Sequence, residues 1–268
     1  MYNFPGKGKM LMEKKYFFFD IDGTLTVAAR DASYVPQSTK MALAKLRENG
    51  HFLAIATGRS YAKALPVMKA LGFENMVHDG GYGITLNNEL IDIEPLNRDD
   101  CIALVRECQA KGILWGIQPE NSDTRFVPDE RFMEFTHDQY MKSKIIPGLD
   151  PENYEKIYKV YVACYEPVEH SLETLKKLPW CRFMKEYIFV EPSDKARGIR
   201  RIVDHFGGDY RDVVVFGDHR NDLSMFTGEW TGIAMGNAVE ELKAKADYVT
   251  SDIEDDGIWN ACVRFDWI

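Results

Sequence analysis

Residues 14–26 read KKYFFFDIDGTLT, an apolar run that ends in two aspartates. The phenylalanines at positions 17–19 indicate a strand buried on both faces, as in a parallel sheet covered by helices. Asp20 and Asp22 follow this strand, and side chains two residues apart point to the same face of a strand. We therefore expect two carboxylates close together at the carboxyl end of a strand, where open α/β sheets place their sites.

Similar apolar runs recur along the chain, separated by amphipathic segments. The segments 36–50, 60–72 and the residues from Ser193 onward predict helices. The expected buried strands lie at 51–57, 187–192, 213–218, 232–236 and 246–250, and residues 75–86 are expected to hold a short strand, a glycine turn and another strand. Alternating strands and helices with nearly continuous apolar strands are typical of a parallel α/β sheet.

The pattern changes between about Leu86 and Tyr187. The elements expected there are strands at 89–93, 113–118 and 156–165, and helices at 98–112, 129–141 and 168–178. Because residues 156–165 alternate between apolar and polar, this strand is expected to be half exposed, in an open antiparallel sheet. We therefore predict an α/β protein with a Rossmann-like parallel-sheet core, residues 1–86 and 188–268, and an inserted α+β domain, residues 87–187.

Composition narrows the possible functions. A formal net charge of −9 over 268 residues argues against nonspecific binding to nucleic acid or to an anionic membrane. No apolar run is long enough to span a bilayer. The five cysteines are scattered, which favours reduced thiols in a cytoplasmic protein. Residues 1–11 lack the apolar core of a secretion signal and are expected to be a lead-in outside the fold.

A second strand also ends in acids. The run VVVFGDHRND, residues 213–222, has four apolar residues and a glycine, followed by Asp218 and Asp222. Carboxylates that converge from two parallel strands repel one another unless a cation lies between them. Oxygen-only ligands suit Mg²⁺, so these acids, together with Asp20 and Asp22, are candidate metal ligands.

Two further positions offer donors to an anion. Thr57 and Gly58 end the run AIATGR and supply a hydroxyl and a backbone amide, although a plain turn would use the same residues. Lys195 lies at the start of the helix that we expect Ser193 to cap, where a cation opposes the helix dipole. A bound phosphate would remove this conflict, whereas a solvated surface lysine is the ordinary alternative.

The motifs DIDGTLT, ATGR, SDK and GDHRND occur in this order and resemble the four motifs of the haloacid dehalogenase-like (HAD) phosphatases. The insertion between the second and third motifs resembles the large α/β cap of the Cof-type sugar-phosphatase subfamily. The runs MGNA at 235–238 and ADYVT at 246–250 extend the resemblance over nearly the whole chain after Met12.

The resemblance implies a phosphoric monoester hydrolase and a role for each motif. Asp20 would be the nucleophile that forms an aspartyl-phosphate, and Asp22 the general acid and base. Mg²⁺ would be held by Asp20, the backbone carbonyl of Asp22, and Asp218, with Asp222 binding through a coordinated water or one shell further out. The remaining implied residues hold the phosphoryl oxygens or support those that do: Thr57, Gly58, Lys195 and Asn221. The substrate would be a small phosphorylated metabolite, such as a sugar phosphate, and the protein a monomer or weak homodimer.

Some alternatives stay open. A phosphosugar mutase resembling phosphomannomutase uses a similar aspartate pair and a similar cap, and a non-catalytic sugar-phosphate-binding protein could retain the same motifs. One position departs from the family, which commonly has Asn-Gly-Ala where this chain has Asp79-Gly80-Gly81. Asp79 could alter substrate preference or serve the turn, and we favour the turn because Asp-Gly suits a tight reversal.

Overall fold

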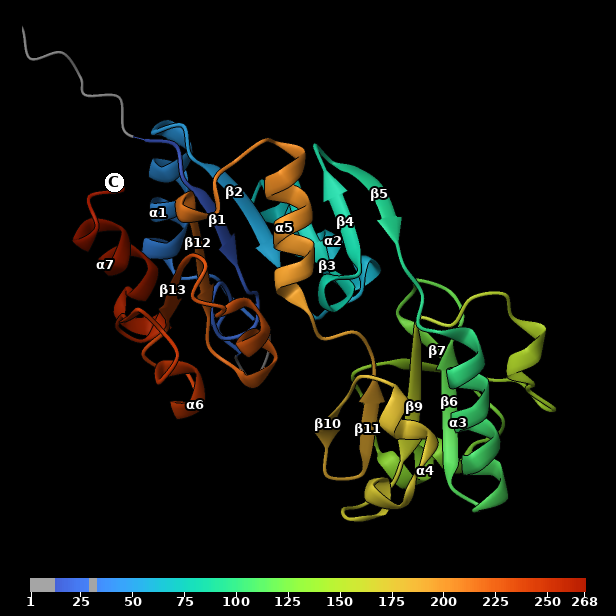
Figure 1. Ribbon diagram of the computed structural model, residues 1–268. Coiled ribbons are helices and arrows are strands. Elements are labelled where there is room, and N and C mark those ends of the chain that lie inside the picture. Colours follow the sequence, from blue (N-terminus) through green and yellow to red (C-terminus); the bar gives the residue numbers. More distant parts are fainter. Residues whose placement is uncertain (1–12, 29–32) are drawn as a thin grey trace, which may run out of the picture. The chain divides into compact units, whose positions relative to one another are not determined.

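The structure, a computed structural model, describes residues 13–28 and 33–268 (Figure 1). The predicted lead-in at residues 1–11 lies outside these ranges. The described strands form an eight-stranded sheet and a six-stranded sheet. By its contacts the chain divides into two units, one of residues up to Ala54 with His205–Ile268, the other of Ile55–Asp204.

The eight-stranded sheet has the order β14-β13-β12-β1-β2-β3-β4-β5. Its strands are β1 (Tyr16–Phe19), β2 (Phe52–Ala56), β3 (Asn75–His78), β4 (Gly83–Leu86), β5 (Glu89–Ile93), β12 (Val213–Gly217), β13 (Thr231–Ala234) and β14 (Tyr248–Val249). The pairs β1–β12, β12–β13 and β13–β14 are parallel, whereas β3–β4 and β4–β5 are antiparallel. The predicted Rossmann-like α/β fold is confirmed, with an antiparallel edge that the prediction did not include.

Strand β1 is buried on both faces, as its three phenylalanines predict. Phe17, Phe18 and Phe19 are each 0% exposed. The ring of Phe17 packs edge-on against Trp267, and that of Phe19 stacks on Phe216 with centroids 5.0 Å apart. Burial of one such ring contributes about 2–3 kcal/mol, so β1 is firmly anchored. The residues that follow it therefore start from a well-defined position.

Four helices each follow a strand of this sheet: α1 (Gln37–Glu48), α2 (Tyr61–Ala70), α6 (Glu240–Lys243) and α7 (Gly257–Arg264). Helix α5 (Lys195–His205) follows β11 (Tyr187–Val190), which belongs to the six-stranded sheet. Helix α1 buries Ala42, Leu43 and Leu46 on one stripe and ends before Gly50, whose φ is +84°. Helix α5 packs tightly on β3, because a Cβ added at Gly198 would lie 2.4 Å from a methyl of Val77. The helices expected at 36–50, at 60–72 and after Ser193 are confirmed.

The six-stranded sheet has the order β10-β11-β9-β6-β7-β8. Its strands are β6 (Leu114–Gln118), β7 (Thr124–Val127), β8 (Lys142–Ile145), β9 (Lys159–Ala163), β10 (Trp180–Met184) and β11 (Tyr187–Val190). The pairs are antiparallel, as expected, except for β7–β8, which is parallel. A segment that includes the short helix α4 (Arg131–Thr136) joins β7 to β8 and permits their parallel pairing.

Both faces of the inner strand β9 of this sheet are covered. Helix α3 (Arg98–Ala110) lies alongside β6 (Figure 1), and its apolar stripe shares a core with Val160 and Val162 of β9. On the opposite face, Tyr161 belongs to a second apolar cluster with residues of α4. Strand β9 is buried throughout, so the predicted exposed face is wrong. The hydroxyl of Tyr161 donates to Gln118 Oε1 at 2.6 Å, and this hydrogen bond compensates for the burial of the hydroxyl group.

Three other expectations for this region need correction. Helix α4 is shorter than the expected 129–141, because its backbone turns left-handed at His137, with φ +49°. Residues 168–178 form two short 3₁₀ helices, Val168–Ser171 and Thr174–Lys177, and no α-helix. Strand β5 was expected in the inserted domain but pairs with β4 of the eight-stranded sheet. Strand β11 was expected in the core sheet but pairs with β9 of the six-stranded sheet. The predicted boundaries at 87 and 187 stay a prediction.

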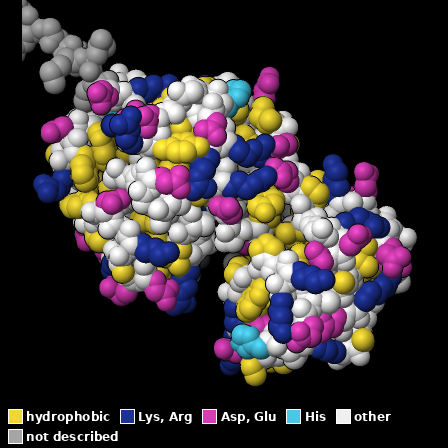
Figure 2. Space-filling view, viewed as in Figure 1, with side chains coloured by type: hydrophobic (Ala, Val, Ile, Leu, Met, Phe, Trp, Pro, Cys, Tyr) yellow, Lys and Arg dark blue, Asp and Glu magenta, His cyan; other side chains and the backbone are white. Residues whose placement is uncertain are grey.

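None of the described helices has the length and apolar character needed to cross a membrane. On the face viewed in Figure 2, acidic and basic side chains are interspersed. Several pair across elements, as where Arg201 bonds to Asp92 at 2.6 Å and Arg197 to Glu94 at 2.8 Å. Such partly exposed pairs contribute little stability individually but connect α5 to β5 and the residue just after it.

Glu107 shows why residues 168–178 do not form one helix. Its carboxylate accepts the backbone N–H groups of Glu173 and Thr174 at 3.0 and 2.9 Å, and it also binds Lys111. Burial opposes its ionisation, but the hydrogen bonds from Lys111 and Thr174 outweigh this and lower the pKa of Glu107 to about 2. The backbone N–H groups of Glu173 and Thr174 thus donate to a side chain of α3 and not to carbonyls of one continuous helix over residues 168–178.

We predict that Glu107→Gln lowers stability at pH 7 and that the loss shrinks as the pH falls. The pKa of Glu107 is about 2 in the folded state against 4.5 as a model value. Its contribution is therefore complete above about pH 5 and is lost on acidification toward pH 2. Urea midpoints of both proteins from pH 7 to pH 3 test this. A difference that stays constant with pH would contradict it.

Candidate functional site

Three carboxylates converge in the first unit. One oxygen each of Asp20, Asp218 and Asp222 lie within 4.8 Å of one another. The three residues are 3%, 8% and 0% exposed. Asp20 follows β1 and Asp218 follows β12, and these strands run parallel with Phe19 opposite Phe216. The sequence-based expectation that acids from two strand ends meet is confirmed for these three residues.

Local hydrogen bonds hold the carboxylates of Asp218 and Asp222 in place. Asp222 Oδ2 accepts the N–H groups of Asp218 and His219 at 2.9 and 3.0 Å, so this side chain closes the turn after β12. The hydroxyl of Thr24 donates to Asp218 Oδ1 at 2.9 Å. The turn after β1 requires glycine, because Gly23 has φ +89° and an added Cβ would lie 2.2 Å from Asp218 Oδ2.

Asp22 has a different environment from Asp20. Strand β1 ends at Phe19, so the alternation of side chains along a strand does not extend to these two residues. The chain turns after Ile21, whose carbonyl accepts the N–H groups of Leu25 and Thr26. Asp20 is buried and Asp22 is exposed. Asp20 and Asp22 therefore do not share one strand face, contrary to the expectation from the sequence.

The acidic cluster has the chemistry of a site for a hard cation. Two unit charges about 5 Å apart repel by about 3 kcal/mol at an effective dielectric constant of about 20. Three buried carboxylates offer only oxygen ligands, which suit Mg²⁺ or another hard divalent ion. The residues of this cluster therefore fit a metal of that kind.

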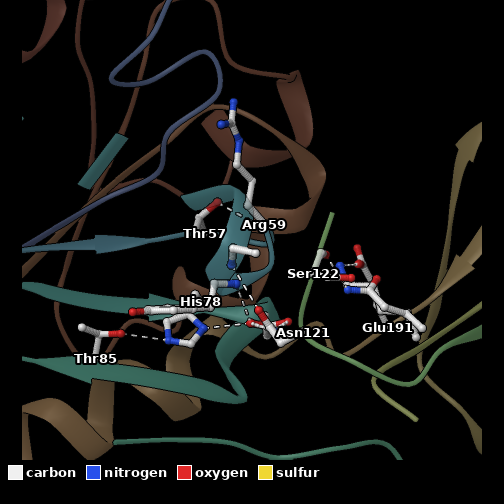
Figure 3. Close-up of polar contacts among 12 residues, drawn as sticks. Thr57, Arg59, His78, Thr85, Asn121, Ser122 and Glu191 are labelled. Atoms are coloured by element: carbon white, nitrogen blue, oxygen red, sulfur yellow. Dashed lines mark hydrogen bonds and ion pairs between the residues drawn. The ribbon is translucent and has the colours of Figure 1, made fainter. Parts of the chain in front are cut away.

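The other predicted residues occupy defined positions. Thr57, 1% exposed, follows β2, and its Oγ1 accepts the N–H of Arg59 at 3.1 Å (Figure 3). Gly58 is partly exposed. Asn221 is exposed, on the 3₁₀ helix Arg220–Met225 of the first unit.

Lys195 is the first residue of α5 and is 1% exposed, so the interpretation as a solvated surface lysine is wrong. The N-terminus of this helix also differs from the prediction. Asp194 Oδ1 accepts the N–H of Arg197 at 3.0 Å, so Asp194 caps the helix in place of Ser193. A buried ammonium group at a helix N-terminus is expensive unless anions surround it.

The turn interpretation of Asp79 is confirmed. Residues Asp79–Gly81 form a 3₁₀ turn between β3 and β4, with φ values of +48°, +62° and +102°. A Cβ at Gly80 would lie 1.9 Å from the carbonyl oxygen of Pro192, and one at Gly81 would lie 1.8 Å from that of Asp194. Only glycine permits this close approach of the turn to the start of α5.

Within the predicted insertion, the surroundings of Arg125 indicate a packing role. Its side chain is 0% exposed and pairs with Asp138 at 2.8 Å. Its Nε donates to Ser143 Oγ at 2.9 Å, and its guanidinium lies over the ring of Phe132. The sequence prediction did not include Asn121, which lies in the loop between β6 and β7 and belongs to no motif.

Comparisons with known proteins identify the family. A family model described as haloacid dehalogenase-like hydrolase matches residues 17–262. The chain belongs to this family. It is 30% identical over 251 residues to a Bacillus subtilis protein named "Putative phosphatase YkrA", covering 92% of this chain and 96% of that one.

Solved structures agree. A Geobacillus kaustophilus protein without a named function matches with a TM-score of 0.81 and 30% identity, over 96% of this chain and all of that one. The HAD subclass IIB sugar phosphatase BT4131 matches with a TM-score of 0.76 and 27% identity, over 95% of this chain and all of the other. The resemblance drawn from the four motifs is therefore confirmed, as is the prediction of a HAD-like enzyme with phosphatases among its relatives.

We predict that Asp218→Asn stabilises the protein when divalent cations are removed. Asparagine can still accept from Thr24, while one charge leaves the repelling cluster. Relief of about 1 kcal/mol would raise the midpoint of thermal unfolding by about 2–4 °C. Melting in a chelator tests this, with Asp99→Asn as the control, since the Asp99 side chain is 93% exposed. An unchanged or lower midpoint for Asp218→Asn would contradict the predicted repulsion.

Proposed function

We propose that this protein is a Mg²⁺-dependent phosphomonoesterase that hydrolyses small phosphorylated metabolites, with sugar phosphates as the substrate class, through an aspartyl-phosphate. The observation that carries the proposal is the buried cluster of Asp20, Asp218 and Asp222 in a chain of the HAD-like hydrolase family. Similarity to a solved sugar phosphatase supports the substrate class. We also expect the protein to act in the cytoplasm as a monomer or weak homodimer.

The metal would be held by the carboxylates of Asp20 and Asp218 and the backbone carbonyl of Asp22. Asp222 would contribute through a coordinated water or from one shell further out. This fits the geometry of its side chain, of which one oxygen accepts two backbone amides. When bound, Mg²⁺ would neutralise negative charge on the phosphoryl group.

The two aspartates of the first motif would divide the chemistry. Asp20, buried and held beside the other acids, would attack phosphorus while the bond to the leaving oxygen breaks. Asp22 would give its proton to that oxygen and then accept one from the water that hydrolyses the aspartyl-phosphate. Asp22 is exposed, which suits a group that must exchange protons with solvent between the two steps.

Phosphoryl transfer depends mainly on positioning and charge compensation. The Thr57 hydroxyl and the Gly58 amide would donate to oxygens of the transferring group, and Lys195 would supply a positive charge. Asn221 would support these residues. Thr57 and Lys195 are each 1% exposed. Their burial supports phosphate binding over the alternatives of a plain turn residue and a solvated surface lysine.

Asp20→Asn tests the nucleophile. Because an amide is a very poor nucleophile toward phosphorus, we expect hydrolysis of p-nitrophenyl phosphate to fall by about 10³-fold or more. Far-ultraviolet circular dichroism should stay unchanged, and Asp99→Asn should keep full activity. Turnover by Asp20→Asn at a rate near that of the wild type would refute the assignment.

Metal removal is a separate test. A chelator should abolish hydrolysis, and added Mg²⁺ should restore it. Ca²⁺ should restore little, since it takes more ligands at longer distances than Mg²⁺ does. Undiminished activity in the chelator would show that the acidic cluster serves another purpose.

The substrate class requires a panel of phosphorylated metabolites with measurement of released phosphate. We expect hexose and pentose phosphates to be hydrolysed faster than nucleotides. Interconversion of hexose 1-phosphate and hexose 6-phosphate without phosphate release would instead identify a mutase. Binding of a sugar phosphate with no turnover of any compound would identify a non-catalytic protein.

A further inference from the structure

Helix α2 begins without a cap from its own N-cap residue. Ser60 makes no side-chain cap hydrogen bond. The N–H of Tyr61, the first helical residue, donates to Asp79 Oδ2 at 2.9 Å. The N–H of Ala62, the second, donates to Asn121 Oδ1 at 3.1 Å. Two side chains remote in sequence thus satisfy amides that a helix N-terminus leaves without intrahelical partners.

The carboxylate of Asp79 is the centre of this arrangement. It also accepts from His78 Nδ1 at 2.8 Å and from Asn121 Nδ2 at 3.1 Å. His78 is held through its other nitrogen by Thr85 Oγ1 at 3.1 Å, and Figure 3 shows Asn121 and Thr85 on opposite sides of the imidazole. A carboxylate suits a position that meets three donors, because both of its oxygens only accept. Its charge also favours the N-terminus of α2.

The same turn is bonded to residues proposed to hold phosphate. The N–H of Asp79 donates to the Arg59 carbonyl at 2.9 Å, and the N–H of Gly80 donates to the Thr57 carbonyl at 3.2 Å. On the other side, the N–H of Asp194 donates to the Gly80 carbonyl at 2.7 Å, just before Lys195. A displacement of Asp79 would therefore be transmitted to the Thr57 loop and to the start of α5.

Asn121 lies in the loop between β6 and β7, so it reaches this network from the six-stranded sheet. Both ends of its amide are used, the oxygen by Ala62 and the nitrogen by Asp79. A second residue of the same region also contacts the first turn of α2, since Lys63 Nζ lies 3.3 Å from the ring centroid of Tyr140 and bonds to its carbonyl. The start of α2 is thus held from the six-stranded-sheet region at two points.

We propose that Asn121 is a positioning residue, which docks on Asp79 and the first turn of α2 and thereby holds the Thr57–Arg59 loop in its phosphate-binding conformation. The part of this inference that concerns phosphate rests on the proposed function. The docking itself rests only on the hydrogen bonds of Asn121. Asp79, which stands where the family commonly has asparagine, supplies the acceptor that Asn121 requires.

A set of variants separates docking from general stability. Asn121→Asp replaces the donor to Asp79 with a second carboxylate, and Asn121→Ala removes both hydrogen bonds. The exchanged pair Asp79→Asn with Asn121→Asp restores one amide facing one carboxylate. The matched control is Asn153→Asp, the same chemical change at an exposed position of the same unit. Thermal midpoints identify any variant that does not fold.

The first readout is hydrogen–deuterium exchange of the peptide that contains Thr57–Lys63. We expect exchange to accelerate about tenfold in Asn121→Asp and Asn121→Ala, the size expected when one capping interaction is lost. The exchanged pair should return toward the wild-type rate, and the control should match it. Wild-type exchange in Asn121→Asp would overturn the docking, as would exchange in the exchanged pair as fast as in the single variant.

The second readout is the affinity for inorganic phosphate with Mg²⁺ present, measured by calorimetry and as competitive inhibition. We expect the dissociation constant to rise about tenfold in Asn121→Asp and to recover in the exchanged pair. Faster exchange with unchanged phosphate affinity would overturn the coupling to the Thr57 loop. If the wild type neither binds phosphate nor hydrolyses any ester, the proposed function and the coupling both fail, whereas the exchange data still decide whether Asn121 docks.

Discussion

Like-charged carboxylates gather at the ends of two buried strands only where the surrounding structure holds them there. Here β1 is anchored by three fully buried phenylalanines, and the parallel pairing with β12 brings Asp20 and Asp218 to the same end of the sheet. Asp222 is bound to the backbone amides that follow β12, so it cannot swing away. The free energy of core burial thus opposes the electrostatic repulsion and creates a site for a hard cation.

The turn at Asp79–Gly81 connects the elements around the proposed phosphate residues. Its backbone bonds to the Thr57 loop and to the start of α5, and two of its residues must be glycine because carbonyl oxygens approach them closely. The Asp79 side chain extends the same connections to α2 and Asn121. One short turn therefore links local backbone geometry to the arrangement of several side chains that the proposed chemistry needs.

Prediction from sequence succeeded where a segment's own pattern decides its structure. The apolar run at β1, the stripe of α1 and the glycine turn after β3 needed no information from distant residues. Prediction failed where residues from distant segments bind the backbone of a segment or cover one of its faces. Residues 168–178 have a helical pattern, but Glu107 takes two of their amides. Strand β9 alternates like an exposed strand, yet the cluster around α4 covers its second face.

For the site, the sequence by itself determined the order of the motifs, the acids at two strand ends and the family that these indicate. Local chemistry is sufficient for this, because adjacent parallel strands bring their carboxyl ends to one edge. Only the tertiary structure decided that Asp20 is buried and Asp22 exposed, that Asp194 caps α5, and that Asn121 completes the N-terminus of α2. These outcomes depend on hydrogen-bond partners from other segments, and no spacing within the sequence encodes which partner is nearest.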